Sequence, residues 1–421
     1  MSKHNNFFIN PILSRAKNYE ALILIFLLFF LTGPYFFWKW YGSLFVNILV
    51  TTIALIFIWR NTDKLKGKQK SIFSFYVVVW LLYLVNEFVK GARLGVVAYL
   101  PYLLLGLVPF VRKDFGRSVY NRFVALYAIL IGLSMISWVL AVTGIIPPIG
   151  EIGADNESME AQRKAYLVYP LSLIKIGVIE DVTRFCGIFD EAGVVGTLSG
   201  LMLCGLRYNM KDWRAVVILI SGLFSTSMFF YGLTAVYWSL ELLLVRKRYG
   251  VMILLIGGVF ISYQMTKENV VISHLVWDRF EYDSKDGFKG NTREGEKTTS
   301  VVRRMSATGE IWFGVKDKEA YWDEMFGTAS IYNVFAMYGI IFTVLYIVWI
   351  IIVGYHYRLS RWDFFLYCFM VVGCLYQRPS VFDLPYLFLF VGAARYLEFQ
   401  MDAVKPHRIL RRQNANVSVN A

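Results

Sequence analysis

The chain has 421 residues, of which 57% are hydrophobic and 17% aromatic, and its mean hydropathy is +0.51. A soluble domain of this length does not need so much apolar surface, so the composition excludes an ordinary soluble protein and indicates a polytopic membrane protein. The formal net charge of +13 would suggest nucleic acid in a soluble protein, but its distribution here indicates membrane orientation, and we expect no nucleic-acid partner.

Long hydrophobic runs follow one another along the chain, and they predict an all-α integral membrane protein with about 12 transmembrane helices. The first run is flanked by tryptophans and no small-residue cleavage site follows it, so we interpret it as an uncleaved span. The runs are 21–38, 41–59, 71–89, 95–111, 123–142, 191–206, 215–226, 228–245, 250–264, 331–354, 363–377 and 382–396.

Residues 215–245 form an apolar stretch that is too long for one simple span and short for two. We predict two short helices that meet at Ser225-Thr226-Ser227, because hydroxyl groups can satisfy the backbone groups freed at a break. One tilted helix is the alternative, and it would place the basic residues 246–248 on the opposite side of the membrane.

Basic residues gather in alternate connections, and the positive-inside rule assigns these connections and both termini to the cytoplasm. The medium loop 147–183 and the large loop 265–330 then lie outside, and 398–421 is a basic cytoplasmic tail of a single membrane domain, 1–421. We expect the aromatic-rich large loop to fold partly onto the outer face. The basic stretches are 3–17, 60–70, 112–122, 207–214, 246–248, 358–361 and 395–412.

The sequence predicts neither a cofactor nor a metal. It contains no Walker A or Rossmann glycine pattern, so nothing indicates an ATP-driven pump. It also contains no HExxH or CxxC arrangement. Three of the four cysteines fall inside hydrophobic runs, so no disulfide framework is indicated.

The segment from Arg184 to Gly196 places an arginine, two acids and three glycines where a polar loop re-enters a hydrophobic run. Charged groups at this depth are costly unless they are paired or functional. Arg184 suits a bidentate clamp on phosphate or pyrophosphate, and a salt bridge to Asp181, Asp190 or Glu191 is the alternative. Glu191 is a candidate general base for a sugar hydroxyl or a structural partner of Arg184, whereas Asp190 fits a helix N-terminal acid.

Further arginines outside the membrane are candidates for binding an anionic headgroup. Arg303 and Arg304 are adjacent in the large loop, and a solvated basic pair is the simpler alternative. Arg279 is a weaker candidate of the same kind. Arg378 lies in a short connection between two spans, where a snorkelling or structural role is the alternative. Tyrosine and tryptophan are abundant in these loops, which fits either sugar stacking or an interfacial aromatic belt.

The pattern Arg184-Phe-x-Gly-x-Phe-x-Glu191-x-Gly193 opens a span after an outer loop, and it resembles the signature of bacterial O-antigen and exopolysaccharide polymerases of the Wzy type. These belong to the O-antigen ligase superfamily. The arrangement of spans and loops is similar as well, and so is the broken Ser-rich segment 225–227. The chain departs from the family at Ala192, where proline is common, and at Met228, where arginine is common.

The resemblance implies a GT-C-like helical fold in the bacterial inner membrane, with an active site that faces the periplasm. It implies a metal-independent glycosyltransferase that polymerises repeat units carried on undecaprenyl pyrophosphate, with a chain-length regulator as a possible partner. Arg184 and Glu191 would be catalytic, and Arg303, Arg304 and the arginines at 279 and 378 would bind pyrophosphate.

Three other functions stay open. A ligase would transfer the finished glycan to a lipid A core, but ligases carry a histidine near the end of the large loop, where this chain has Thr328, Ser330 and Asn333. A lipid-linked oligosaccharide flippase would be expected to carry ionisable residues deep in several spans and repeat symmetry between its halves. A non-catalytic assembly or sensor protein is the third alternative.

Overall fold

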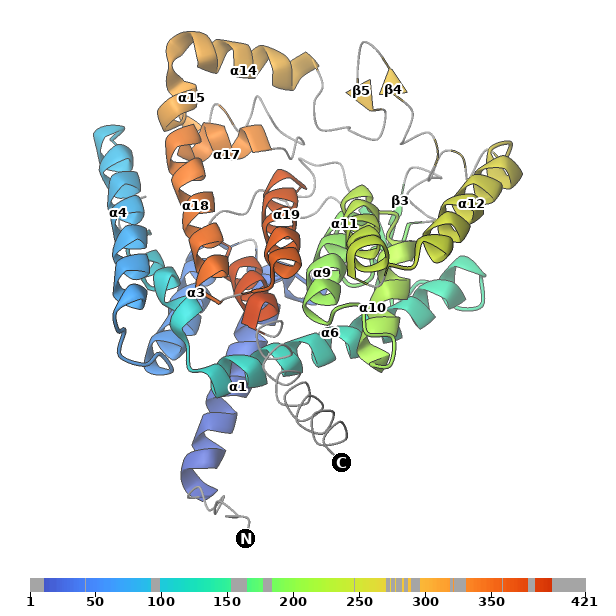
Figure 1. The fold of residues 1–421 in the computed structure, drawn as a ribbon, viewed down its shortest axis with the longest axis horizontal. Coiled ribbons are helices and arrows are strands. Elements are labelled where there is room, and N and C mark those ends of the chain that lie inside the picture. The colour runs from blue at the N-terminus through green and yellow to red at the C-terminus, as the bar shows by residue number, and fades with distance from the viewer. Residues whose placement is uncertain are drawn as a thin grey trace, which may run out of the picture.

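The structure is a computed structural model of the chain. It describes residues 11–41, 43–91, 99–152, 165–176, 184–245, 247–269, 273, 277, 282–283, 287–288, 296–318, 321, 331–357, 359–377 and 383–395. These residues are mostly helical, which confirms the helical class, and each predicted hydrophobic run contains a helix (Figure 1).

The helices of the first half of the chain are α1 (Pro11–Leu31), η1 (Tyr35–Phe37), α2 (Trp38–Tyr41), α3 (Leu44–Arg60), α4 (Lys68–Val89), η2 (Leu100–Phe110), α6 (Lys113–Val142) and α9 (Ala192–Gly205). They continue with α10 (Trp213–Phe224), α11 (Met228–Ser239), η3 (Leu240–Val245), α12 (Tyr249–Thr266), α14 (Glu296–Thr308), α15 (Glu310–Phe313), α17 (Ile331–Tyr338), α18 (Ile340–His356), α19 (Arg361–Gln377) and a last helix, Leu384–Arg395.

Three helices in the described part of the chain, namely α4, α6 and α12, are long and apolar enough to cross a membrane. A fourth crossing is formed if α17 and α18 are counted together, although they meet at an angle of 112°. The other apolar helices, including the part of α1 from Asn18 to Leu31, are shorter, from 10 to 17 residues. The number of about 12 spans and their orientation therefore stay predictions.

The break that the sequence predicts at residues 225–227 is confirmed, because α10 ends at Phe224 and α11 begins at Met228. Thr226 has a φ of 49°, in the left-handed region, and lies between the two helices. The hydroxyl of Ser225 donates to the Gly222 carbonyl over 2.6 Å, as expected of a hydroxyl at a broken helix end. Both short helices pack on α9.

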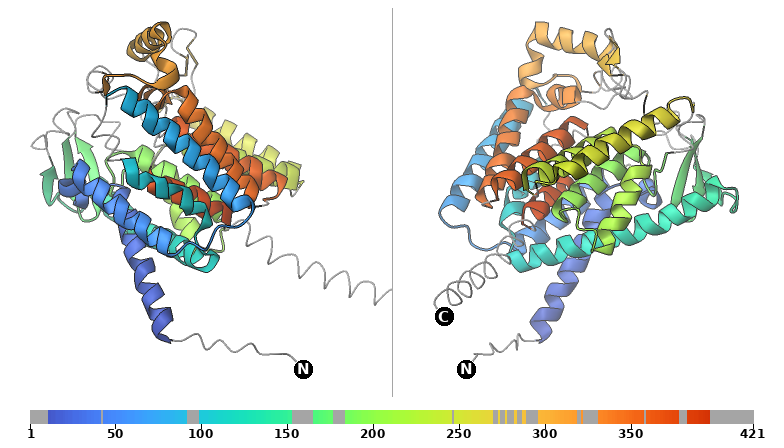
Figure 2. Two further views of the ribbon diagram at one scale, coloured as in Figure 1. Left: turned by 90° about the vertical axis from the view of Figure 1, so that its left-hand side faces the viewer. Right: turned by 45° about the vertical axis from the view of Figure 1, so that its right-hand side comes forward.

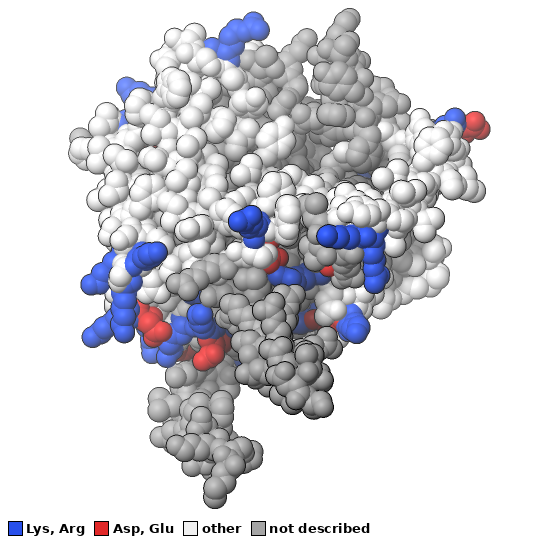
Figure 3. All heavy atoms as spheres, in the orientation of Figure 1, with Lys and Arg blue, Asp and Glu red and all other residues white. Residues whose placement is uncertain are grey.

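Helix ends that carry basic residues are joined to one another by polar contacts at one end of the bundle. Arg207, after α9, pairs with Asp363 at the start of α19 over 2.6 Å. Arg60, at the end of α3, pairs with Glu20 of α1 over 3.0 Å. The Arg395 side chain donates to the Tyr357 hydroxyl over 3.1 Å. Figure 3 shows blue Lys and Arg side chains gathered across the lower part of the molecule.

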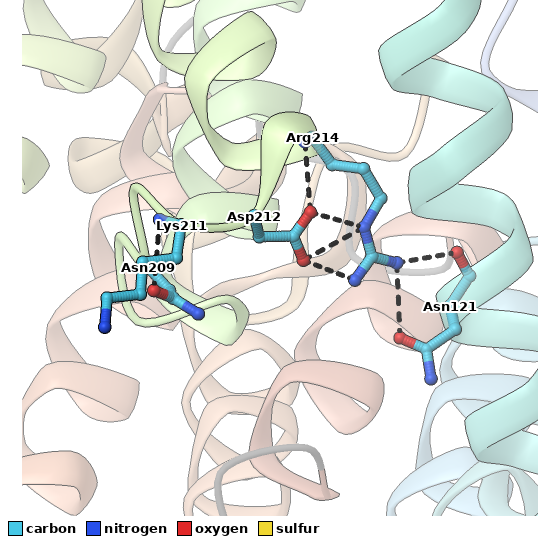
Figure 4. Close-up of polar contacts among 5 residues, drawn as sticks. All are labelled: Asn121, Asn209, Lys211, Asp212 and Arg214. Carbon is cyan, nitrogen blue, oxygen red and sulfur yellow. Dashed lines mark hydrogen bonds and ion pairs between the residues drawn. The ribbon is translucent and has the colours of Figure 1, made fainter.

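A further contact at this end joins α10 to α6 (Figure 4). Asp212 is the N-cap residue of α10 and accepts a hydrogen bond from the Arg214 backbone N–H over 3.0 Å. The Arg214 guanidinium pairs with Asp212 over 2.5 Å and also donates to the Asn121 carbonyl over 3.3 Å. These contacts place Arg60, Arg207, Arg214 and Arg395 of the predicted basic connections in polar pairings, and the orientation of the bundle stays a prediction.

The medium loop holds a three-stranded antiparallel sheet, which the all-α prediction missed. Its strands are β1 (Gly150–Ile152), β2 (Ala165–Tyr169) and β3 (Ser172–Ile176), in the order β1-β2-β3. Strands β2 and β3 are rich in aromatic and β-branched residues, which favour extended backbone. The sheet contacts α6 (Figure 2), and its buried Tyr166 packs edge-on against Trp38. A second pair of strands, β4 (Tyr282–Asp283) and β5 (Gly287–Phe288), lies in the large loop.

Candidate functional site

The segment 184–191 leads into α9 and is held through its backbone by four separate elements. Each contact uses one hydrogen bond of 2.8 to 3.1 Å, so the position of the segment is fixed along its whole length. The bonds are Phe185 N–H to the Phe224 carbonyl (α10), Leu173 N–H (β3) to the Gly187 carbonyl, Tyr35 N–H (η1) to the Ile188 carbonyl, and the Tyr166 hydroxyl (β2) to the Asp190 carbonyl.

The apolar side chains of this segment face the core, and its charged side chains stay partly exposed. Residues 185–189 are buried, whereas Arg184, Asp190 and Glu191 have intermediate exposure. Gly187 has a φ of +60°, and a Cβ there would lie 2.6 Å from the Ile131 side chain, so only glycine fits this turn. Burial of the hydrophobic residues therefore places the arginine and the two acids at the edge of the bundle.

Arg184 is bonded to the helix break. Its Nε donates to the Thr226 hydroxyl over 2.9 Å, across 42 positions of sequence. Among the residues that the structure describes, no ion pair joins Arg184 to Asp190 or Glu191, and its two Nη groups have no partner. Asp181, the third salt-bridge candidate, lies outside the described residues. The guanidinium is therefore oriented by one hydrogen bond while two donor groups are left for an anion.

Glu191 occupies the N-cap position of α9, with extended backbone angles and no hydrogen bond from its side chain to the first turn. The helix begins at Ala192, so Asp190 lies outside the first turn and Glu191 is the acid nearest to the positive end of the helix dipole. The interpretation of Asp190 as the N-terminal helix acid is therefore off by one residue. A base or a structural role for Glu191 stays a prediction.

Gly196 lets α9 approach the break between α10 and α11. A Cβ at this position would lie 2.2 Å from the Ser227 Cβ and 2.8 Å from the Ser225 hydroxyl oxygen. Such a separation is far below an ordinary contact between carbon atoms, so any larger residue would push the helices apart. The close approach keeps Thr226 beside the segment that carries Arg184.

The structure does not bring Arg303 or Arg304 to this site. Arg303 and Arg304 are exposed on α14, which packs against α15 and α17 through the buried Val301 and Met305. Figures 1 and 2 draw α14 at the top of the molecule, apart from α9, α10 and α11. Residues 279 and 378 lie outside the described part, so the predicted roles of Arg279 and Arg378 stay predictions.

A buried acid that sequence reasoning missed lies at the end of α4. Glu87 is 1% exposed, and its carboxylate pairs with Lys318 of the large loop over 2.6 Å and with Lys90 over 3.7 Å. Burial lowers the pKa of the Lys90 ammonium, and the Glu87 charge opposes this shift. The sequence could have indicated this buried acid, because a glutamate inside the predicted run 71–89 is costly without a partner.

No protein-family model, curated protein or solved structure matches the chain. Within the described residues, no group of three or more His, Cys, Asp or Glu side chains is placed to hold a metal ion.

Proposed function

We propose that the chain is an inner-membrane glycosyltransferase that polymerises oligosaccharide repeat units carried on undecaprenyl pyrophosphate, at the periplasmic face. The observation that carries the proposal is the geometry of Arg184: its Nε is bonded to Thr226, and within the described chain its two Nη groups have no partner. A guanidinium held in this way is preorganised for an oxyanion of phosphate or pyrophosphate.

The position of Arg184 supports the same proposal. Helix α9 runs from the Arg184 segment to Arg207, which belongs to the basic end of the bundle. Its 14 residues rise by about 21 Å, so Arg184 lies near the opposite end of the bundle. If the basic end faces the cytoplasm, as the positive-inside rule predicts, Arg184 faces the periplasm.

The proposed reaction uses the bond between the glycan and its pyrophosphate carrier. A hydroxyl of the acceptor repeat unit attacks the anomeric carbon of the donor, the new glycosidic C–O bond forms, and the C–O bond to pyrophosphate breaks. Arg184 stabilises the negative charge that develops on the departing undecaprenyl pyrophosphate. Glu191, seven residues further on, accepts the proton of the acceptor hydroxyl.

One observation favours a polymerase over a ligase. In the stretch where ligases carry a histidine, the described candidate is Asn333, which is 6% exposed and accepts a hydrogen bond from the Tyr321 hydroxyl over 2.9 Å. A buried amide that is used in this way is a structural group rather than a base. Thr328 and Ser330 lie outside the described residues.

The test is deletion of the gene in its host, followed by electrophoresis of the surface polysaccharide. Loss of a polymerase leaves a single repeat unit on the lipid core, loss of a ligase leaves bare core, and loss of a flippase traps lipid-linked units inside. Bare core or trapped units would refute the proposal.

Complementation with Arg184 variants tests the site itself. We expect Arg184→Ala to abolish chain extension at an unchanged protein level, and Arg184→Lys to restore little, because lysine keeps the charge but not the planar fork. Arg248→Ala, an exposed arginine before α12, is the matched control and should leave chain length unchanged. Long chains from Arg184→Ala would remove this residue from the mechanism.

A further inference from the structure

Two elements that are distant in sequence expose apolar side chains next to each other at one end of the bundle. On α4 these are Val85, Phe88 and Val89, which are 60%, 64% and 78% exposed. On α15 they are Trp312 and Phe313, which are 53% and 56% exposed. We call these five residues the α4–α15 patch.

Polar contacts fix α15 to this end of α4. The Phe313 carbonyl accepts a hydrogen bond from the Asn86 amide over 2.8 Å and another from the Lys90 ammonium over 2.5 Å. The ion pair between Lys318 and Glu87 ties the following residues to the same turn of α4. This part of the large loop is therefore attached to α4 by buried and half-buried charges.

The packing of α15 against α17 and α18 also depends on glycine. Gly314 has a φ of +86°, and a Cβ there would lie 2.7 Å from the Ala336 carbonyl oxygen. Gly339, between α17 and α18, has a φ of +83° and would clash with the backbone of Phe313 in the same way. The two glycines therefore fix the position of α15 against α17 and α18, and the exposed aromatic side chains of α15 face away from the bundle.

The length of α4 sets the depth of this patch. Its 22 residues rise by about 33 Å, slightly more than the roughly 30 Å of a bilayer hydrocarbon core. Lys68 and Lys70 lie at one end of the helix and Lys90 follows the other, so each end reaches a membrane boundary. Because the Phe313 carbonyl bonds to Lys90, α15 lies at the level of that boundary.

We propose that the α4–α15 patch is a lipid-contact surface and that α15 rests in the boundary layer of the bilayer at the Lys90 end of α4. The patch continues the exposed apolar stripe of α4, which includes Val78, Leu81 and Leu82. Tryptophan favours the membrane boundary, where its ring meets both acyl chains and polar headgroups. The large loop is thus anchored to the membrane surface at this point, independently of the proposed reaction.

The experiment places a fluorescent thiol label on the full chain in lipid nanodiscs. Trp312→Cys reports on α15, Leu82→Cys reports on the lipid-facing part of α4, and Ser306→Cys on the exposed side of α14 is the water control. The unsubstituted chain gives the background, because three of its four cysteines are buried. Quenchers are iodide in water and phospholipids with a doxyl group near the headgroup or near the chain end.

We expect the label at 312 to lose fluorescence to the doxyl group near the headgroup, to lose less to the deep doxyl group, and to resist iodide. The label at 82 should prefer the deeper quencher, and the label at 306 should respond to iodide alone. Equal iodide quenching at 312 and 306 would overturn the proposal. Protection of 312 from all three quenchers would also overturn it, because protein would then cover the patch; Phe313→Cys repeats the test if Trp312→Cys does not fold.

Discussion

Substitution of Gly196 by alanine tests the packing that supports the Arg184 site. The added Cβ would lie 2.2 Å from the Ser227 Cβ, whereas carbon atoms in contact are about 3.8 Å apart, so α9 and the break must separate by about 1.6 Å. Ser225 and Ser227 are 0% and 2% exposed and have no room to turn away. Overpacking of this kind costs about 1–3 kcal/mol, and we expect the upper end of that range.

Gly232→Ala on α11 is the matched control, because a Cβ there meets nothing within 4 Å. Alanine is favoured over glycine in a helix by about 1 kcal/mol, so the control should be neutral or slightly stabilising. The two variants should therefore differ by roughly 3 kcal/mol. Thermal unfolding can be followed with a thiol-reactive dye, since Cys186, Cys204 and Cys374 are buried and become reactive on unfolding.

A compensating change makes this test specific. Ser227→Gly removes the Cβ against which Ala at position 196 would press, so the double variant should regain most of the lost stability. If Gly196→Ala unfolds at the same temperature as Gly232→Ala, the close approach of α9 to the break does not exist. If Ser227→Gly fails to restore stability, the contact lies elsewhere on α9.

Three other substitutions have defined outcomes. Glu87→Gln should destabilise the protein by about 3 kcal/mol in the dye assay, because it removes the buried carboxylate that pairs with the partly buried Lys90 and Lys318. The hydrogen bond from Arg214 lowers the pKa of Asp212 below 3.8, so its stabilisation is complete above that pH and is lost as the pH falls through the lower folded value. Asp212→Asn should therefore cost up to about 1 kcal/mol at neutral pH and nothing in strong acid, as measured by unfolding midpoints. Thr226→Gly should keep or raise stability by relieving the positive φ, yet shorten the polysaccharide, because Arg184 loses its acceptor.

Each of these outcomes has a clear opposite. Glu268 is exposed, so Glu268→Gln is the control for Glu87→Gln. If both variants lose the same stability, the burial of Glu87 does not matter. If the unfolding midpoints of the unsubstituted chain and Asp212→Asn differ by the same amount at every pH, the ion pair between Asp212 and Arg214 does not contribute to stability. Full-length polysaccharide from Thr226→Gly would show that Arg184 does not need its hydrogen bond to the break.

The sequence predicted the helical elements well because long apolar runs of the length that spans a membrane have few alternatives to helix. It also predicted the break at 225–227, because three adjacent hydroxyl residues interrupt a stretch that is too long for one span. The sheet of the medium loop was missed because its strands have only three to five residues, too few to establish a period of two.

Pairings between distant residues were the part that the sequence could not predict. Nothing in the spacing of Arg184 and Thr226, which are 42 positions apart, indicates that they meet. The cost of Glu87 in an apolar run was predictable, but its partner Lys318 lies 231 positions away in a loop. Such contacts depend on how helices pack, and a single sequence does not determine that packing from local preference alone.

The helix break explains why Arg184 has a fixed geometry. Thr226 is a β-branched residue with a positive φ, a conformation that costs about 1–3 kcal/mol and persists only where the surroundings impose it. Here α9 presses against the break at Gly196, and the Thr226 hydroxyl is aimed at the Arg184 Nε. One continuous helix through 225–227 would relieve the strain but would turn the hydroxyl away from the guanidinium. The hydroxyl-rich sequence therefore does more than end a helix, because the strained residue it supplies orients the arginine on which the proposed chemistry depends.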